Sequence, residues 1–102
     1  MHYFMIEAAA TTELMEEEGL GGAYVNCWIN FSLQDGAEVL ARYYIEQDGW
    51  LPRETHEHRW AEQKDYQDNP DDLQYYLEAE SEGVCFVFNT WPLDEEDTAI
   101  EP

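Results

Sequence analysis

Positively charged side chains are the scarcest feature of this sequence. Only 4 of its 102 residues are Lys or Arg, whereas 24 are Asp or Glu, so the formal net charge is −20. Direct nucleic-acid binding depends on Lys and Arg that neutralise phosphates, and anionic membrane surfaces attract the same residues. The charge therefore excludes both kinds of partner. A basic protein surface, a bound cation or solubility alone remains as an explanation of the acidity.

Cysteines and long apolar segments are also few. Cys27 and Cys85 lie within apolar runs, where we expect small core side chains and not a secreted disulfide framework. No apolar stretch approaches the ~20 residues of a transmembrane helix, and the first residues lack the basic region of a signal peptide. We therefore expect a cytoplasmic protein.

Motifs of catalytic sites are missing from the sequence. It has no glycine-rich phosphate loop, no G-x-S-x-G, no C-x-x-C and no H-E-x-x-H. Its two serines, Ser32 and Ser81, lie at expected helix ends. We predict that the protein is not an enzyme, and no motif indicates a cofactor.

The material for a folded core is present, because 44% of the residues are hydrophobic and 15% are aromatic. The length suits one domain, which we place at residues 1–92. Residues 93–102 contain four adjacent acids and no periodicity. We expect this acidic tail to be disordered.

Hydrophobic periodicity and capping signals define seven elements. We predict strands at 2–8, 23–31, 50–61 and 84–91, a short helix at 13–18, and longer helices at 33–48 and 70–82. The second strand has the clearest signal, because its apolar side chains alternate strictly. The third strand is polar on both faces and contains Pro52, which favours an edge position. The fourth begins apolar on both faces, which favours a central position.

The order β-(short α)-β-α-β-α-β indicates an α+β fold. Two amphipathic helices can cover one face of a four-stranded sheet, and right-handed crossovers place them on the same side. We therefore predict an open-faced sandwich of ferredoxin-like character, with a mainly antiparallel or mixed sheet and both main helices on one face.

The uncovered face of such a sheet would be aromatic. Its side chains would be Tyr24, Asn26, Trp28 and Asn30, joined by Trp60 or Trp91. Exposed aromatic and amide side chains favour protein contact, with Trp and Tyr as anchors. The alternative is that the N-terminal segment, the tail or residues 10–20 fold over this face.

Acidic residues at helical spacing form a second candidate surface, which we call the acidic helix face. Its members are Asp71, Tyr75, Glu78 and Glu82 on the last helix, continued by Glu13, Glu16 and Glu17 on the short one. Acids spaced along one elongated face would imitate the phosphates of a nucleic acid.

His56 and His58 are the candidate metal ligands. Side chains at i and i+2 of a strand point to one face, so the imidazoles would lie side by side, flanked by Glu54. Zn²⁺ and Cu²⁺ accept such donors, but two histidines do not complete a site. The pattern is equally that of two exposed residues on an edge strand.

These features favour a small acidic binding or regulatory protein that contacts a basic protein surface, as an inhibitor, an immunity-type protein or a nucleic-acid mimic. Two alternatives stay open. One is a metal-binding protein or small enzyme that uses His56 and His58, and the other is a homodimer through the aromatic sheet face.

The charge generates a first prediction, on stability. Folding brings the 24 carboxylates closer together than they are in the unfolded chain, so the folded state binds more protons as the pH falls. Stability should then rise between pH 7 and about pH 5.5, and salt at ~0.5 M should raise it at pH 7 by screening. Thermal melts under these conditions measure both effects. A melting temperature that is highest at pH 7 in low salt would show that local partners compensate the acids.

Overall fold

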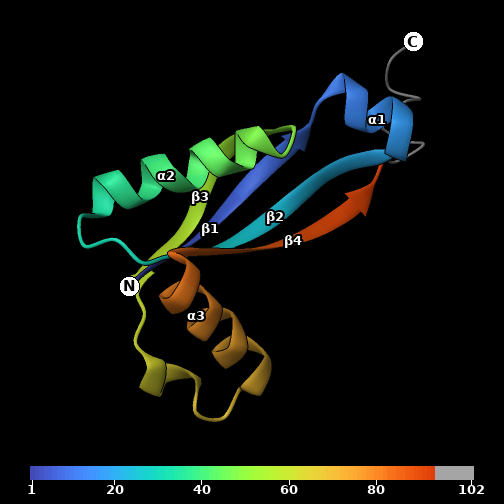
Figure 1. Ribbon diagram of the computed structural model, residues 1–102. Coiled ribbons are helices and arrows are strands. Elements are labelled where there is room, and N and C mark those ends of the chain that lie inside the picture. The colour runs from blue at the N-terminus through green and yellow to red at the C-terminus, as the bar shows by residue number, and fades with distance from the viewer. Residues whose placement is uncertain (94–102) are drawn as a thin grey trace.

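The computed structural model describes residues 1–93 and has an α+β fold with one open, four-stranded antiparallel sheet (Figure 1). The strands are β1 (His2–Ala10), β2 (Leu20–Ile29), β3 (Trp50–Trp60) and β4 (Val84–Pro92). The helices are α1 (Thr12–Glu18), α2 (Gln34–Gln47) and α3 (Pro70–Glu82), with a 3₁₀ turn, η1 (Gln63–Tyr66), before α3. The elements follow one another in the predicted order. From residue 94 onward, the tail that we expected to be disordered lies outside the described residues.

Local capping bonds fix where two helices begin. The Thr11 hydroxyl caps α1 by accepting a hydrogen bond from the Leu14 N–H at 3.4 Å. The Asn69 side chain caps α3 through the Asp72 N–H at 3.3 Å. Pro70 follows in the first turn of α3, where its missing N–H costs no helical hydrogen bond. Both helices therefore begin within one residue of the predicted positions, 13 and 70.

The strands lie in the order β3-β1-β2-β4, and each neighbouring pair is antiparallel. β1 and β2 form the central hairpin and are joined through α1. The edge position of β3 confirms the prediction from its polar faces. The prediction of a central position for residues 84–91 was wrong, because β4 is the other edge strand. β4 is apolar on both faces for another reason: side chains on one face pack toward α2, and those on the other face pack toward α3.

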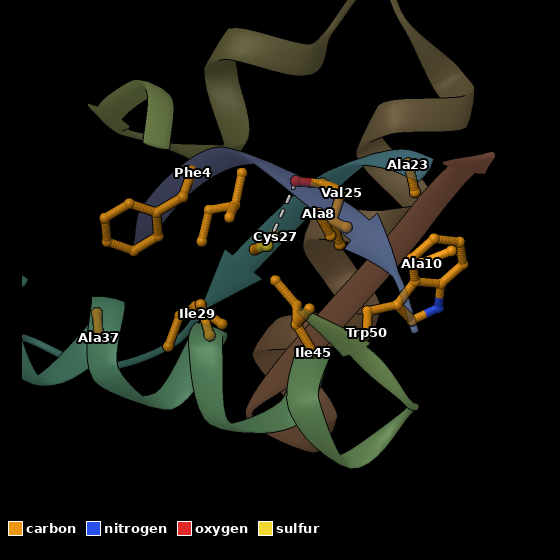
Figure 2. Packing of buried hydrophobic residues seen from close by; sticks show 12 residues of the cluster. Phe4, Ala8, Ala10, Ala23, Val25, Cys27, Ile29, Ala37, Ile45 and Trp50 are labelled. Atoms are coloured by element: carbon orange, nitrogen blue, oxygen red, sulfur yellow. Dashed lines mark hydrogen bonds between the residues drawn. The ribbon is translucent and has the colours of Figure 1, made fainter. Parts of the chain in front are cut away.

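α2 covers one face of the sheet (Figure 2). Its buried side chains Ala37 and Ala41 are small, which lets the helix lie close to the strands, and Ile45 packs at its C-terminal end. Trp50 at the start of β3 closes the cluster. β1 and β2 contribute the buried residues Phe4, Ile6, Ala8, Ala10, Ala23, Val25, Cys27 and Ile29. We call this cluster the α2 core.

α3 packs against the opposite face, so the two main helices do not share one face as we predicted (Figure 1). Ala79 of α3 and Tyr66 of η1 cluster with Tyr3, Trp28 and Cys85 of the sheet. We call this cluster the α3 core. The predicted ferredoxin-like arrangement is therefore not confirmed.

Strand direction explains why the handedness rule failed for α3. The rule applies to crossovers between parallel strands, and α2 makes such a crossover from β2 to β3 over β1. β3 and β4 are antiparallel to each other and lie at opposite edges of the sheet, so the rule does not restrict α3. The apolar side chains on the second face of β2 and β4 determine its position instead.

Trp28 provides a test of the α3 core. It is 2% exposed, and its Nε1 donates a hydrogen bond to the Tyr66 hydroxyl at 3.0 Å. Trp28→Ala should lower the free energy of unfolding by ~3–5 kcal/mol. The matched change Trp60→Ala, at a side chain that is 53% exposed, should cost less than about 1 kcal/mol. Urea unfolding measures both values, and equal costs would contradict the coverage of Trp28 by α3.

Candidate binding surface on the open half of the sheet

The face of the sheet that carries α3 is covered over only part of its length. α3 packs near Trp28 and Cys85. Tyr24, four residues before Trp28 in β2, is 41% exposed. Strand register aligns Tyr24 with Glu7 of β1 and Asn89 of β4, so these side chains share the face. Figure 1 shows the strands continuing beyond α3 toward α1. We call this part of the face the open half of the sheet.

Five side chains cross the open half, and we call them the aromatic row: Glu7, Tyr24, His56, Asn89 and Trp91. His56 Nε2 lies 2.7 Å from Glu7 Oε1. The Tyr24 ring meets the His56 ring edge to face, with centroids 5.8 Å apart, and its centroid lies 5.1 Å from that of Trp91. Asn89 Nδ2 donates a hydrogen bond to the Tyr24 carbonyl at 3.3 Å. The row therefore includes a residue from each of the four strands.

A β-bulge in β3 places His56 in the aromatic row. Met5 of β1 pairs with Glu57, but the next residue, Ile6, pairs with Thr55, so β3 has one extra residue at this point. That residue is His56, and its hydrogen bond to Glu7 puts the ring on the open half of the sheet.

The same bulge separates the two histidines of the predicted metal site. His58 pairs with Phe4 on the α2 side of the sheet, and the two ring centroids are 4.8 Å apart. His56 and His58 therefore face opposite sides, and our prediction that they share a face with Glu54 was wrong. Glu54 is exposed on β3. Within residues 1–93, no three His, Cys, Asp or Glu side chains are placed to hold one metal ion.

His58 instead pairs with His2, a histidine that is only 7% exposed. His2 Nε2 lies 3.1 Å from the Ser32 carbonyl oxygen, so this nitrogen carries the proton and donates it. His2 Nδ1 and His58 Nε2 are 3.0 Å apart and share a hydrogen bond. The Trp60 ring lies edge-on to His2, with centroids 4.9 Å apart, so Trp60 is on the α2 side and not on the predicted aromatic sheet face.

The predicted aromatic sheet face is only partly present. Tyr24 is exposed, but Trp28 is buried, so our expectation that it faces outward was wrong. The covering segment is α3, which was not among the alternatives that we had considered. Asn26 is half-buried and accepts a hydrogen bond from the Tyr3 hydroxyl at 3.2 Å. Asn30 is exposed and follows the last residue of β2, Ile29.

Tyr3 links the α3 core to the open half of the sheet. Burial, and then the charge of Glu57, raises the pKa of Tyr3 to about 12. The hydroxyl therefore stays protonated at neutral pH and remains a donor to Asn26. The guanidinium of Arg59 lies 4.6 Å from the centre of the Tyr3 ring, which is a cation–π contact within the protein.

The predicted acidic helix face lies along the junction of α3 with the sheet. The Tyr75 ring packs into the α3 core, and Glu78 Oε2 accepts a hydrogen bond from Cys85 Sγ at 3.1 Å. Burial, and then this hydrogen bond to Glu78, raises the pKa of Cys85 to about 12. Asp71 and Glu82 are exposed. Two of the four α3 members of this face, Tyr75 and Glu78, therefore make contacts within the protein.

The acids of α1 do not continue that face. They lie at the far end of the sheet from α3 (Figure 1): Glu13, Glu16 and Glu17.

Three of the four basic residues already have acidic partners, with N···O distances of 3.3 to 3.8 Å: Arg42 with Glu38, Arg59 with Glu57, and Lys64 with Glu62. The acidic surface thus has few counter-charges of its own.

A shallow pocket of about 280 Å³ lies between η1 and α3. Its lining residues are Gln63, Lys64, Gln67 and Leu73. They include no nucleophile with an adjacent base and no pair of carboxylates, which are the combinations that hydrolytic catalysis uses. This pocket therefore indicates no reaction.

Comparison with known protein families, curated proteins and solved structures finds no match for this chain. No helix within residues 1–93 has both the length and the apolar character needed to cross a membrane. The aromatic row and the uncompensated charge are therefore the features on which a functional inference can rest.

Sequence reasoning missed three residues of this surface: Glu7, Gly22 and Asn89. Glu7 is the only acidic residue within β1, and an acid in an otherwise apolar strand is itself a signal of an open position. Gly22 lies under the Trp91 ring. A Cβ atom there would come within 2.8 Å of Trp91 Cε2 and 3.0 Å of the Ala8 carbonyl oxygen, so the ring sits where no side chain fits.

Gly22→Ala should therefore displace the Trp91 ring from Tyr24 while all aromatic residues are retained. We expect the indole N–H signal of Trp91 in ¹H–¹⁵N spectra to shift, after assignment through Trp91→Phe. The Trp60 indole signal, on the other face, is the internal control and should stay in place. An unchanged Trp91 signal would contradict the seating of the ring on Gly22.

Proposed function

We propose that this chain is a small acidic binding protein whose aromatic row contacts a basic protein surface. The proposal rests on one observation: the exposed Tyr24 ring lies beside the Trp91 ring, with the Glu7 carboxylate next to Tyr24 on an open sheet. Aromatic faces attract Lys and Arg side chains through cation–π interactions. A neighbouring carboxylate adds a charge-assisted hydrogen bond to the same cation.

The rest of the acidic surface has a longer-range role in this proposal. A net charge of −20 with few internal counter-charges attracts a basic partner before contact and speeds the encounter. The aromatic row then supplies the short-range contacts. This division predicts an association that weakens steeply with salt, while its specificity depends on the row.

We favour an inhibitor or immunity-type role over nucleic-acid mimicry. Mimicry needs acids along one elongated face, whereas the acids of α1 and α3 lie at different ends of the sheet (Figure 1). Homodimerisation through the aromatic face has less support, because Trp28 is buried and each copy carries the same large charge. We propose a cytoplasmic location, where the free thiols of Cys27 and Cys85 would stay reduced.

Affinity capture from native extract tests the proposed function. The immobilised protein should retain a basic protein at ~50 mM salt and release it at ~0.5 M, where the screening length is a few ångströms. The double variant Tyr24→Ser, Trp91→Ser should lose that same protein. The matched control Tyr43→Ser removes a ring that is 53% exposed on α2 and should retain it.

The comparison between variants decides the outcome. Retention by both variants would show that the charge alone attracts the protein and would overturn the role of the aromatic row. If no basic protein is retained by the unmodified chain at low salt, the proposed function fails as a whole. Thermal melts of each variant establish that the fold is intact.

A further inference from the structure

β4 is an edge strand without the usual protection of an edge. Within residues 1–93 its only strand neighbour is β2, so one side of its backbone has no strand partner there. Its nine residues, VCFVFNTWP, include no charged side chain. Unpaired N–H and C=O groups on a long, uncharged edge are a template for another strand.

The opposite edge strand, β3, has the features that usually prevent an edge from pairing with another strand. β3 contains two register shifts, a proline and charged side chains along its length, all of which obstruct a further strand. β4 has one register shift and one proline, Pro92, and both are confined to its C-terminal end, where it pairs with Leu20 and Gly22. The two edges of one sheet are thus built differently, and β4 has the composition of a central strand.

Side chains that could receive a partner lie on both faces of β4. On the α2 side, Phe86 and Phe88 are half-buried, and the Phe86 ring centroid lies 5.6 Å from that of Tyr44, which is 40% exposed. On the other side, Asn89 and Trp91 belong to the aromatic row. An added strand would project alternate side chains onto these two surfaces.

We infer that the free edge of β4 binds an extended segment of the basic partner as a fifth strand of the sheet. This inference rests on the proposed function and specifies how the partner is held. The negative charge around β4 favours a basic segment. Glu80 and Glu82 precede β4, and the sequence after it continues with four acids, from Asp94 to Asp97. A second copy of the chain, with its own net charge of −20, meets repulsion at this edge, whereas a basic segment is attracted.

The geometry defines the kind of segment that fits. Apolar side chains at alternate positions would contact Phe86, Phe88 and Tyr44. Lys or Arg side chains at the positions between them would reach the Trp91 ring of β4 on the other face. The segment is therefore about as long as β4 and alternates apolar and basic residues.

Synthetic peptides test the inference directly. The probe is a fluorescent nine-residue peptide in which valine and lysine alternate, matching the length of β4. Two further peptides carry N-methyl groups on all the valines or on all the lysines. N–H groups of alternate residues point to opposite sides of a strand, so only one of the two methylated sets would face β4.

We expect one methylated peptide to bind like the unmodified one and the other to lose about tenfold or more in affinity, since it lacks several main-chain hydrogen bonds. Amide signals of β4 should shift in ¹H–¹⁵N spectra on binding. Thr90→Lys, which puts a cation on this edge, should weaken binding by about fivefold or more relative to Leu51→Lys, the same charge change on the β3 edge.

Each other outcome overturns the inference. If both methylated peptides bind as tightly as the unmodified one, strand addition is wrong. The proposed function then still stands if the Tyr24, Trp91 double variant loses its captured partner. No binding of any peptide also rejects a basic segment at this edge. Sedimentation that shows a dimer, broken by Thr90→Lys, would assign the edge to a second copy of the chain.

Discussion

The antiparallel pairing of β1 with β2 is the interaction on which the other contacts depend. Each facing pair of residues sends both side chains to one face, so successive pairs supply two separate cores. Phe4 and Cys27 face each other in the α2 core, whereas the adjacent pair, Tyr3 and Trp28, belongs to the α3 core. A shift of register by one residue would exchange the two sets and move Tyr24 off the open half of the sheet. The hairpin therefore determines both the packing and the aromatic row.

Net charge and open apolar surface are complementary features of this protein. An uncharged edge strand beside exposed aromatic rings is a hazard for self-association in most proteins. Here most of the acids are on the helices or in the sequence before and after β4, and they repel a second copy of the same chain. The net charge thus opposes self-association at this edge although β4 itself has no charged side chain.

Local patterns predicted the elements, and the errors arose where the outcome depends on distant residues. The alternation that indicated a strand around 23–29, the start of the helix at residue 70 and the polar character of β3 are properties of neighbouring residues, and these predictions are confirmed. The bulge at His56 has no signal in the sequence T-H-E-H, because it exists only relative to β1. Tyr24 and Trp28 share one face of one strand, and only the position of α3 along that strand makes one of them exposed and the other buried. The exposure of Tyr24 could therefore be predicted from the sequence, but the burial of Trp28 could not.

The two cores have no buried residue in common, and this separation has a consequence for cooperativity. Proteins open locally in subglobal units whose free energies of opening differ. η1 and α3 form such a unit, because they pack on the sheet from one side while the hairpin and α2 hold together on the other. Its opening would expose Trp28 and Cys85 and lengthen the open half of the sheet to its full extent. The area that the protein offers to a partner is then set by an equilibrium between a docked and an undocked α3.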